Sequence, residues 1–242
     1  MRFLWSRHSI RWFLEASAYS DFHRNLAERI KPYLRPDDTL CDAGCGLGRL
    51  DLELAPYVSS LTAIDTDSNV ISELQKDAAQ LGLKNLQALC GDAAALTGCF
   101  DLVLMSFFGK TGMSAYYPLC RRKLIRIVNA VNQSKLYPNQ QRHTQKDTIS
   151  SVKQELTAKG SGFDLVVDKF EFGQPLRSWQ EGELFISHHA PKASPQEISN
   201  FLHDNAVSTG RDDFPYYLPN HKEIGIFIID ASYSWEKSSV AK

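Results

Sequence analysis

The chain has 242 residues, of which 43% are hydrophobic and 23% charged, enough for one domain with a large buried core. These proportions exclude a mostly disordered or fibrous chain. Lys and Arg total 27 against 28 Asp and Glu, a near-neutral balance that counts against a dedicated nucleic-acid binder, although a local basic patch stays open. No apolar run approaches the roughly 18 residues of a membrane span, so we expect no membrane association.

Cysteine usage indicates the compartment. The chain has five cysteines, an odd number, and no CxxC pair, so a disulfide framework is not expected. Several of them stand in apolar runs, where a cysteine acts as a small buried hydrophobic residue. We therefore expect a reducing, cytoplasmic location.

The N-terminal stretch is rich in arginine and aromatic residues. Arg2, Arg7 and Arg11 would also suit an organelle presequence. An N-terminal helix of the domain is favoured, because acidic residues follow and the apolar pattern continues to Ile30. We find no small-residue cleavage site after an apolar core, and therefore expect no secretory signal.

Short apolar runs alternate with helical patterns along the first two thirds of the chain, and one more apolar run closes it. Strands are predicted at residues 39–42, 61–65, 86–89, 101–105, 124–131, 163–167 and 224–229, and helices at 50–55 and 70–81. Two capping boxes, Thr144 with Asp147 and Ser194 with Glu197, predict the starts of two more helices. This alternation predicts an α/β protein with a mainly parallel sheet and helices on both faces.

We predict a single domain with four parts. These are an N-terminal helical cap at residues 1–38, a core at 39–172, a helical insertion or lid at 173–222, and the last strand at 223–233. The insertion is inferred because about fifty residues separate the last two strands, too many for a plain connection. The polar tail from Ser234 is expected to fray.

The most informative segment is Asp42-Ala43-Gly44-Cys45-Gly46-Leu47-Gly48-Arg49, between the first strand and a helix. Glycines there allow a tight turn and close approach of a ligand to the backbone. A dinucleotide fingerprint, GxGxxG, fails because Arg49 stands at its last glycine. A phosphate-binding loop at Gly109-Lys110-Thr111 fails because Leu104 stands at its first glycine. What remains is an acidic residue followed by GxGxG.

DAGCGLGRL resembles the first motif of the class I S-adenosylmethionine-dependent methyltransferases. The resemblance implies that Gly44, Gly46 and Gly48 pass under the methionine part of this cofactor and that Asp42 helps hold its ammonium group. Cys45, inside the turn, is expected to be a small packing residue of the same site. A carboxylate suits a ligand that carries a cationic amino group and a sulfonium but no phosphate.

Further motifs of that family follow in order. Asp65 ends the second strand 23 residues after Asp42, and its two oxygens could accept both ribose hydroxyls. The resemblance implies that the following one or two residues, Thr66 and Asp67, line the adenosine. Asp92 and Ala93 resemble the adenine-binding motif, and Ser106 ends the strand that faces the methyl group. Asp65 alone is more often a strand-end cap and Asp92 alone a turn residue, so the prediction depends on their ordered combination.

The resemblance implies a Rossmann-like methyltransferase fold, a three-layer sandwich whose seven-stranded, mostly parallel sheet has an antiparallel last strand. It also implies an enzyme that uses S-adenosylmethionine. Tyr19, upstream of the turn, is carried over as an aromatic residue that covers the cofactor.

Absent motifs favour a small-molecule acceptor. Amine-methylating relatives carry a D/N/S-P-P-Y/F motif where this chain has Ser106-Phe107-Phe108-Gly109, and no Pro-Cys dipeptide of the cytosine enzymes occurs. The end of the fourth strand also lacks the acidic residue of the metal-dependent catechol type, and we predict no metal. RNA or protein methylation, a non-catalytic cofactor-binding module and, least favoured, a dehydrogenase stay open. The oligomeric state is not predicted, and a homodimer is compatible with the sequence.

Aromatic residues provide a candidate acceptor wall, although each of them also suits core packing. They are Phe107, Phe108, Tyr116, Tyr117, Trp179, Phe185, Phe214, Tyr216 and Tyr217. The catalytic residue is not identified; the weak candidates are His188, His189 and Tyr116. A surface or capping role is favoured for the two histidines, which lack a third ligand at metal-binding spacing.

Overall fold

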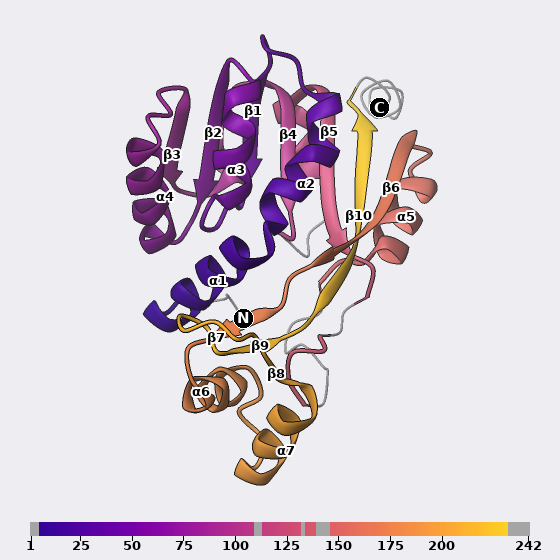
Figure 1. The fold of residues 1–242 in the computed structure, drawn as a ribbon. Coiled ribbons are helices and arrows are strands. Elements are labelled where there is room, and N and C mark those ends of the chain that lie inside the picture. Colours follow the sequence, from indigo (N-terminus) through magenta and orange to yellow (C-terminus); the bar gives the residue numbers. More distant parts are fainter. Residues whose placement is uncertain (1–4, 109–112, 132–133, 139–145, 232–242) are drawn as a thin grey trace.

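The computed structural model describes residues 5–108, 113–131, 134–138 and 146–231. A seven-stranded sheet with the order β3-β2-β1-β4-β5-β10-β6 forms its centre (Figure 1). Strand β10 is antiparallel to β5 and β6, and the other neighbours are parallel, which confirms the predicted fold class. The strands are β1 (Thr39–Ala43), β2 (Ser60–Asp65), β3 (Leu86–Cys90), β4 (Phe100–Ser106), β5 (Cys120–Asn129), β6 (Phe163–Glu171) and β10 (His221–Asp230).

Helices cover both faces of this sheet because each turns an apolar stripe toward it. The first face carries α2 (Phe22–Ile30), α3 (Arg49–Leu54) and α4 (Ser68–Gln80), whose Leu26, Leu54 and Leu74 are fully buried. The second face carries α5 (Ile149–Ala158) through Val152 and Leu156, together with short 3-10 turns. The result is the expected three-layer arrangement.

The N-terminal segment forms two helices instead of one. Helix α1 (Arg7–Ser20) begins with a capping box between Ser6 and Ser9, and it ends where Asp21 takes the left-handed conformation with φ 49°. A short polar side chain tolerates that conformation better than most, so Asp21 turns the chain into α2.

In the described part of the chain, no helix is long and apolar enough to cross a membrane.

The two predicted capping boxes have different outcomes. Ser194 and Glu197 cap α7 (Pro195–Asn205) as expected, with proline at its first position. The box at Thr144 is wrong in its placement: Thr144 lies outside the described residues, and α5 is capped by Thr148 and Ser151. Ser151, at the third helical position, replaces the usual acidic partner of the capping box. A pattern of Ser or Thr followed by an acidic residue therefore does not match this helix start.

Residues 173–222 are mixed rather than purely helical. They hold α6 (Trp179–His189), α7 and a second sheet of β7 (Gln174–Leu176), β9 (Tyr216–Leu218) and β8 (Val207–Ser208). Strand β10 already begins at His221, two residues before the expected boundary. In Figure 1 this insertion lies beyond the carboxyl end of β5, on the same side as α1. The insertion therefore lies at the edge where the parallel strands end.

Candidate functional site

The glycine turn connects β1 to α3 in a conformation that requires its glycines. Gly44, Gly46 and Gly48 have φ of 77°, 56° and 60°, a region that side chains with a Cβ disfavour. The backbone N–H groups of Gly44 and Cys45 both donate to the Ile64 carbonyl, at 2.8 and 3.1 Å. The turn is thereby fastened to the neighbouring strand β2.

Asp65 makes a second connection between β2 and the turn. Its Oδ2 accepts the Gly46 N–H at 3.0 Å, and its Oδ1 accepts the Asp67 N–H at 2.9 Å. A carboxylate oxygen has capacity for more than one donor, so both oxygens can still accept hydroxyl groups. Thr66, the next residue, is exposed to solvent. This half-buried carboxylate is in place to receive a diol.

The predicted adenine side is built around Asp92, which is exposed at the end of β3. Its Oδ1 accepts the Ala94 N–H at 2.9 Å and caps a 3-10 turn that begins with the buried Ala93. Burial raises the pKa of Tyr116, and the negative charge of Asp92 raises it further. Ser106 is half-buried at the end of β4.

Asp42 ends β1 in a buried position, and the sequence reading missed its partner, Asp51. The two side chains are 2% and 0% exposed. Burial raises the pKa of each carboxyl, and the neighbouring Asp51 charge raises that of Asp42 further. Asp51 falls on the same face of α3 as the buried Leu54, which follows it three residues later. That spacing is the signal that could have identified it as a core residue.

Two aromatic rings cover the glycine turn. The Phe108 ring packs on Gly44 so closely that a Cβ there would overlap it, and the Trp5 ring is the neighbour of Gly46, 3.7 Å from where its Cβ would be. Tyr19 instead stacks on Tyr217, with 4.7 Å between ring centroids. The Tyr19 ring therefore packs against the insertion, while Trp5 lies beside the turn, and a contact of Tyr19 with the cofactor stays a prediction.

A second group of rings surrounds a lysine next to Phe108. We call Phe22, Phe107 and Phe172 the aromatic cluster. The Lys222 Nζ lies 3.7 Å from the Phe172 ring centroid, 5.1 Å from that of Phe22 and 5.5 Å from that of Phe107, distances typical of cation–π contacts. His23 packs against the Phe22 ring at 4.9 Å. The sequence gives no motif for this arrangement, because its members come from α2, β10 and two loops.

His23 is kept neutral in this setting. Burial lowers its pKa to about 3, with further contributions from the positive charges of Lys222 and Arg49. Its Nδ1 shares a hydrogen bond with the Ser17 hydroxyl, 2.6 Å away. The imidazole therefore joins α1 to α2 beside the glycine turn.

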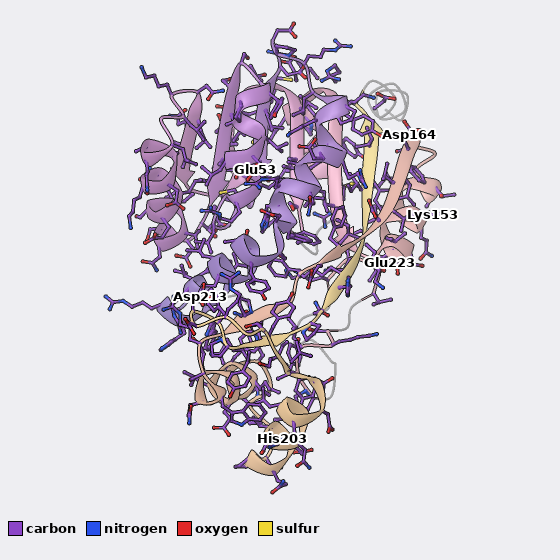
Figure 2. All side chains as sticks on the ribbon, in the orientation of Figure 1. Glu53, Lys153, Asp164, His203, Asp213 and Glu223 are labelled. Atoms are coloured by element: carbon purple, nitrogen blue, oxygen red, sulfur yellow. The ribbon has the colours of Figure 1, made fainter. Side chains whose placement is uncertain are left out.

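His188 and His189 are not brought to the glycine turn. They lie on α6 and pack against Trp12, with ring centroids 5.6 and 6.3 Å away, and burial lowers the pKa of His189 to about 4. Figure 2 shows His203 on α7 and Glu53 on α3 in opposite parts of the molecule. Among the described residues, no group of three or more His, Cys, Asp or Glu side chains could hold a metal ion.

The predicted aromatic wall divides into two groups. Phe107, Phe108 and Tyr116 lie at the carboxyl end of β4, where Phe108 and Tyr116 are in edge contact. The remaining rings pack within or beneath the insertion: Trp179 on His203 and Tyr216, Phe185 on Trp12, Phe214 and Tyr217 on Tyr19, and Tyr117 in the core of the second face. Only the first group is next to the turn.

Together these residues fit a nucleoside that carries a cationic amino acid. Asp42 Oδ1 is buried and accepts no hydrogen bond within the described part of the chain, so it suits an ammonium donor. The glycine turn offers a surface without Cβ atoms, and Asp65 and Asp92 offer carboxylates at two strand ends. A pyrophosphate would be repelled by this set of carboxylates.

Comparison with known proteins gives a match to this part of the chain. Residues 40–124, from β1 into β5, match a family model described as a methyltransferase domain. A ribosomal protein L11 methyltransferase of a Nitratiruptor species is 28% identical over 88 residues. That alignment covers 36% of this chain and 31% of the relative, so the chain spans about a third of the relative's length.

Solved structures share the fold over most of the chain. The YcgJ protein of Bacillus subtilis superposes with a TM-score of 0.54 at 15% identity, covering 85% of this chain and 98% of its own. A magnesium protoporphyrin IX methyltransferase of Synechocystis PCC 6803 with bound S-adenosylmethionine gives 0.51 at 14% identity, covering 95% and 86%. At such identities the likeness shows the fold alone.

Proposed function

Because residues 40–124 match a methyltransferase domain and lie in a sheet of the class I topology, we propose that the protein uses S-adenosylmethionine to methylate a small-molecule acceptor. The observation that carries this proposal is the fastening of the glycine turn to β2. Asp65 accepts the Gly46 N–H, and the buried Asp42 stands directly before the turn.

Each cofactor residue has a separate task in this proposal. Asp42 holds the ammonium group, Asp65 accepts the ribose hydroxyls, and Asp92 accepts from the adenine amine. The three glycines allow close approach of the ligand to the backbone, with Cys45, Thr66, Ala93 and Ser106 around it. When bound, the cofactor supplies a methyl group on a sulfonium, a good leaving group for in-line displacement.

With such a leaving group, the residues mainly have to position the reactants. Proximity and orientation alone lower a barrier by about 7–11 kcal/mol in favourable cases. Neither His188 nor His189 is next to the turn, and a pKa of about 3 makes His23 a weak base, so the proposal includes no general base. An acceptor that arrives deprotonated fits this arrangement.

The half-buried Phe107 and Lys222 support an acceptor with an apolar body and a negative group. Phe107 and Cys45 of the glycine turn pack against the same hydrophobic cluster, in which Phe22 and Phe172 are buried. The Phe107 ring favours an apolar body, and the Lys222 ammonium favours a carboxylate or phenolate.

Protein methylation is the second candidate, favoured by one observation. The relative that matches 88 residues is a ribosomal protein L11 methyltransferase. The match covers only 36% of this chain and 31% of the relative, so the small molecule is preferred. Protein and RNA fractions serve as competing acceptors in the test.

Calorimetric titration with S-adenosylhomocysteine, with NADH in parallel, tests the cofactor. We expect dissociation constants of about 1–100 µM for the first ligand, or about −8 to −5.5 kcal/mol, and no binding of NADH. Absence of S-adenosylhomocysteine binding, or binding of NADH instead, refutes the proposal.

A transfer assay tests the acceptor. Labelled S-adenosylmethionine is incubated with a small-molecule extract, a protein fraction and an RNA fraction, and we expect label only in the first. Label in the protein fraction selects the second candidate. Cofactor binding without transfer to any fraction indicates a non-catalytic binding module.

A further inference from the structure

Asp42 and Asp51 form a buried carboxyl pair directly beneath the glycine turn. Asp42 comes from the end of β1, and Asp51 from the first turn of α3. Within the described chain, three of their four oxygens are buried and accept no hydrogen bond: Asp42 Oδ1, Asp51 Oδ1 and Asp51 Oδ2. Buried polar atoms normally have partners, so this arrangement requires an explanation.

Two adjacent buried carboxyls cannot both be ionised in the free protein. Desolvation penalises each charge, and the first charge opposes the second. Both pKa values are accordingly raised, by burial first. The two side chains interact by a hydrogen bond, so we expect the pair to share one proton and carry one negative charge.

The groups that surround the pair do not neutralise that charge. Asp65 on β2 adds a second negative charge, and the Arg49 guanidinium is engaged by Asp77 of α4 at 2.5 Å. Burial raises the pKa of the Cys41 thiol to about 12 and that of the Cys45 thiol as well, so both stay neutral.

Helix α2, which packs on α3, carries Arg24 and Arg29, but these pair with Asp21 and Asp168, and its partly buried His23 is neutral. A bound cation would therefore be stabilised electrostatically by both carboxylates of the pair and by the nearby Asp65. An ammonium group has three N–H donors, and once the shared proton has left, three buried oxygens of the pair have no donor among the described residues.

We propose that Asp51 is the second carboxyl of the ammonium subsite and that the Asp42–Asp51 pair expels its shared proton when the ligand's ammonium group binds. The inference rests on the proposed function, because it takes the ammonium from the cofactor. The step balances: the ligand keeps its ammonium proton, the pair becomes two carboxylates, and one proton goes to solvent.

The proton count of the wild-type protein tests this directly. Titrations with S-adenosylhomocysteine between pH 6 and 8, in buffers of different ionisation enthalpy, should show release of nearly one proton per ligand, with tighter binding at higher pH. 5′-Methylthioadenosine lacks the amino acid part, and its binding should release none. Equal proton counts for the two ligands would overturn the proposal.

A variant gives the second measurement. Asp51→Asn keeps the size of the side chain, and we expect about tenfold weaker binding of S-adenosylhomocysteine, no proton release and unchanged binding of 5′-methylthioadenosine. Glu53→Gln, on the same helix (Figure 2), is the matched control and should behave as wild type. Unchanged affinity and proton release in Asp51→Asn would refute the role of Asp51. If neither ligand binds the wild type, the proposed function falls and this inference with it.

Discussion

The Phe108 ring packs directly on the Cα of Gly44, at the first glycine of the turn. Gly44 also has a φ of 77°, so two independent constraints exclude a Cβ at this position. The same ring is in edge contact with Tyr116, and its own carbonyl accepts from the buried Arg126 guanidinium. The turn, the end of β4 and the middle of β5 are thereby joined at one residue.

Gly44→Ala is expected to destabilise the protein more than left-handed strain alone explains. The strain costs about 1–2 kcal/mol, and overlap with Phe108 adds about 1–3 kcal/mol. Gly82→Ala is the matched control, because Gly82 has a φ of 69° but nothing within 4 Å of its Cβ position. Denaturant unfolding of both variants measures the difference; equal losses would show that the Phe108 contact does not constrain the turn.

Asp65→Ala is expected to weaken binding of S-adenosylhomocysteine at least tenfold, or about 1.4 kcal/mol. The change removes the carboxylate proposed for the ribose and also releases the Gly46 N–H from its 3.0 Å bond. Asp204→Ala is the control, since Asp204 is an exposed residue of α7, away from the turn. Calorimetric titration measures both variants, and an unchanged affinity for Asp65→Ala would mean that the ribose lies elsewhere.

Much of the fold could be predicted from the sequence, for reasons visible in particular elements. Residues 61–65 and 101–105 are short apolar runs, of which the first ends in Asp65 and the second is followed by Ser106, and both lie in strands that end at the edge of the sheet next to the turn. Gly48 and Asp65 were found because motif spacing is local. Asp21 was not, because a left-handed residue that divides a helix leaves no break in the apolar periodicity.

The parts of the site that the sequence missed depend on contacts between distant segments. Lys222 meets Phe172 and Phe22 only because β10 and β6 pair in antiparallel register and α2 crosses them. Asp51 lies in the helix predicted at residues 50–55, but its burial follows from the packing of α2 on α3. Neither contact has a signature within one segment.

Acidification is expected to destabilise the protein through His23. Its folded pKa of about 3 lies below the ordinary 6.5, so between these values the unfolded state binds more protons. Stability is therefore full above pH 6.5 and falls as the pH decreases toward 3, by up to about 1.4 kcal/mol per pH unit. Urea unfolding at pH 4.5, 5.5, 6.5 and 7.5 should show a shallower slope for His23→Gln. His221→Gln, which removes an exposed histidine, should keep the wild-type slope; an identical slope for all three proteins would contradict this prediction.

Asp147→Asn is expected to destabilise the protein because it leaves the Arg126 charge without its carboxylate. The Arg126 side chain is 2% exposed, and its guanidinium lies 2.7 Å from Asp147 Oδ2. Removing one partner of a fully buried pair costs about 3–5 kcal/mol, and the 26% exposure of Asp147 reduces the expected loss to about 1–3 kcal/mol.

The control for this variant is Asp213→Asn, which breaks an ion pair with Arg211 in which both side chains are 54% exposed. That loss should stay within about 1 kcal/mol. The guanidinium of Arg126 also holds the Phe108 carbonyl, so Asp147→Asn should loosen the ring on Gly44 and alter the affinity for S-adenosylhomocysteine, whereas Asp213→Asn should not. Equal unfolding free energies for the two variants would show that Arg126 does not depend on Asp147.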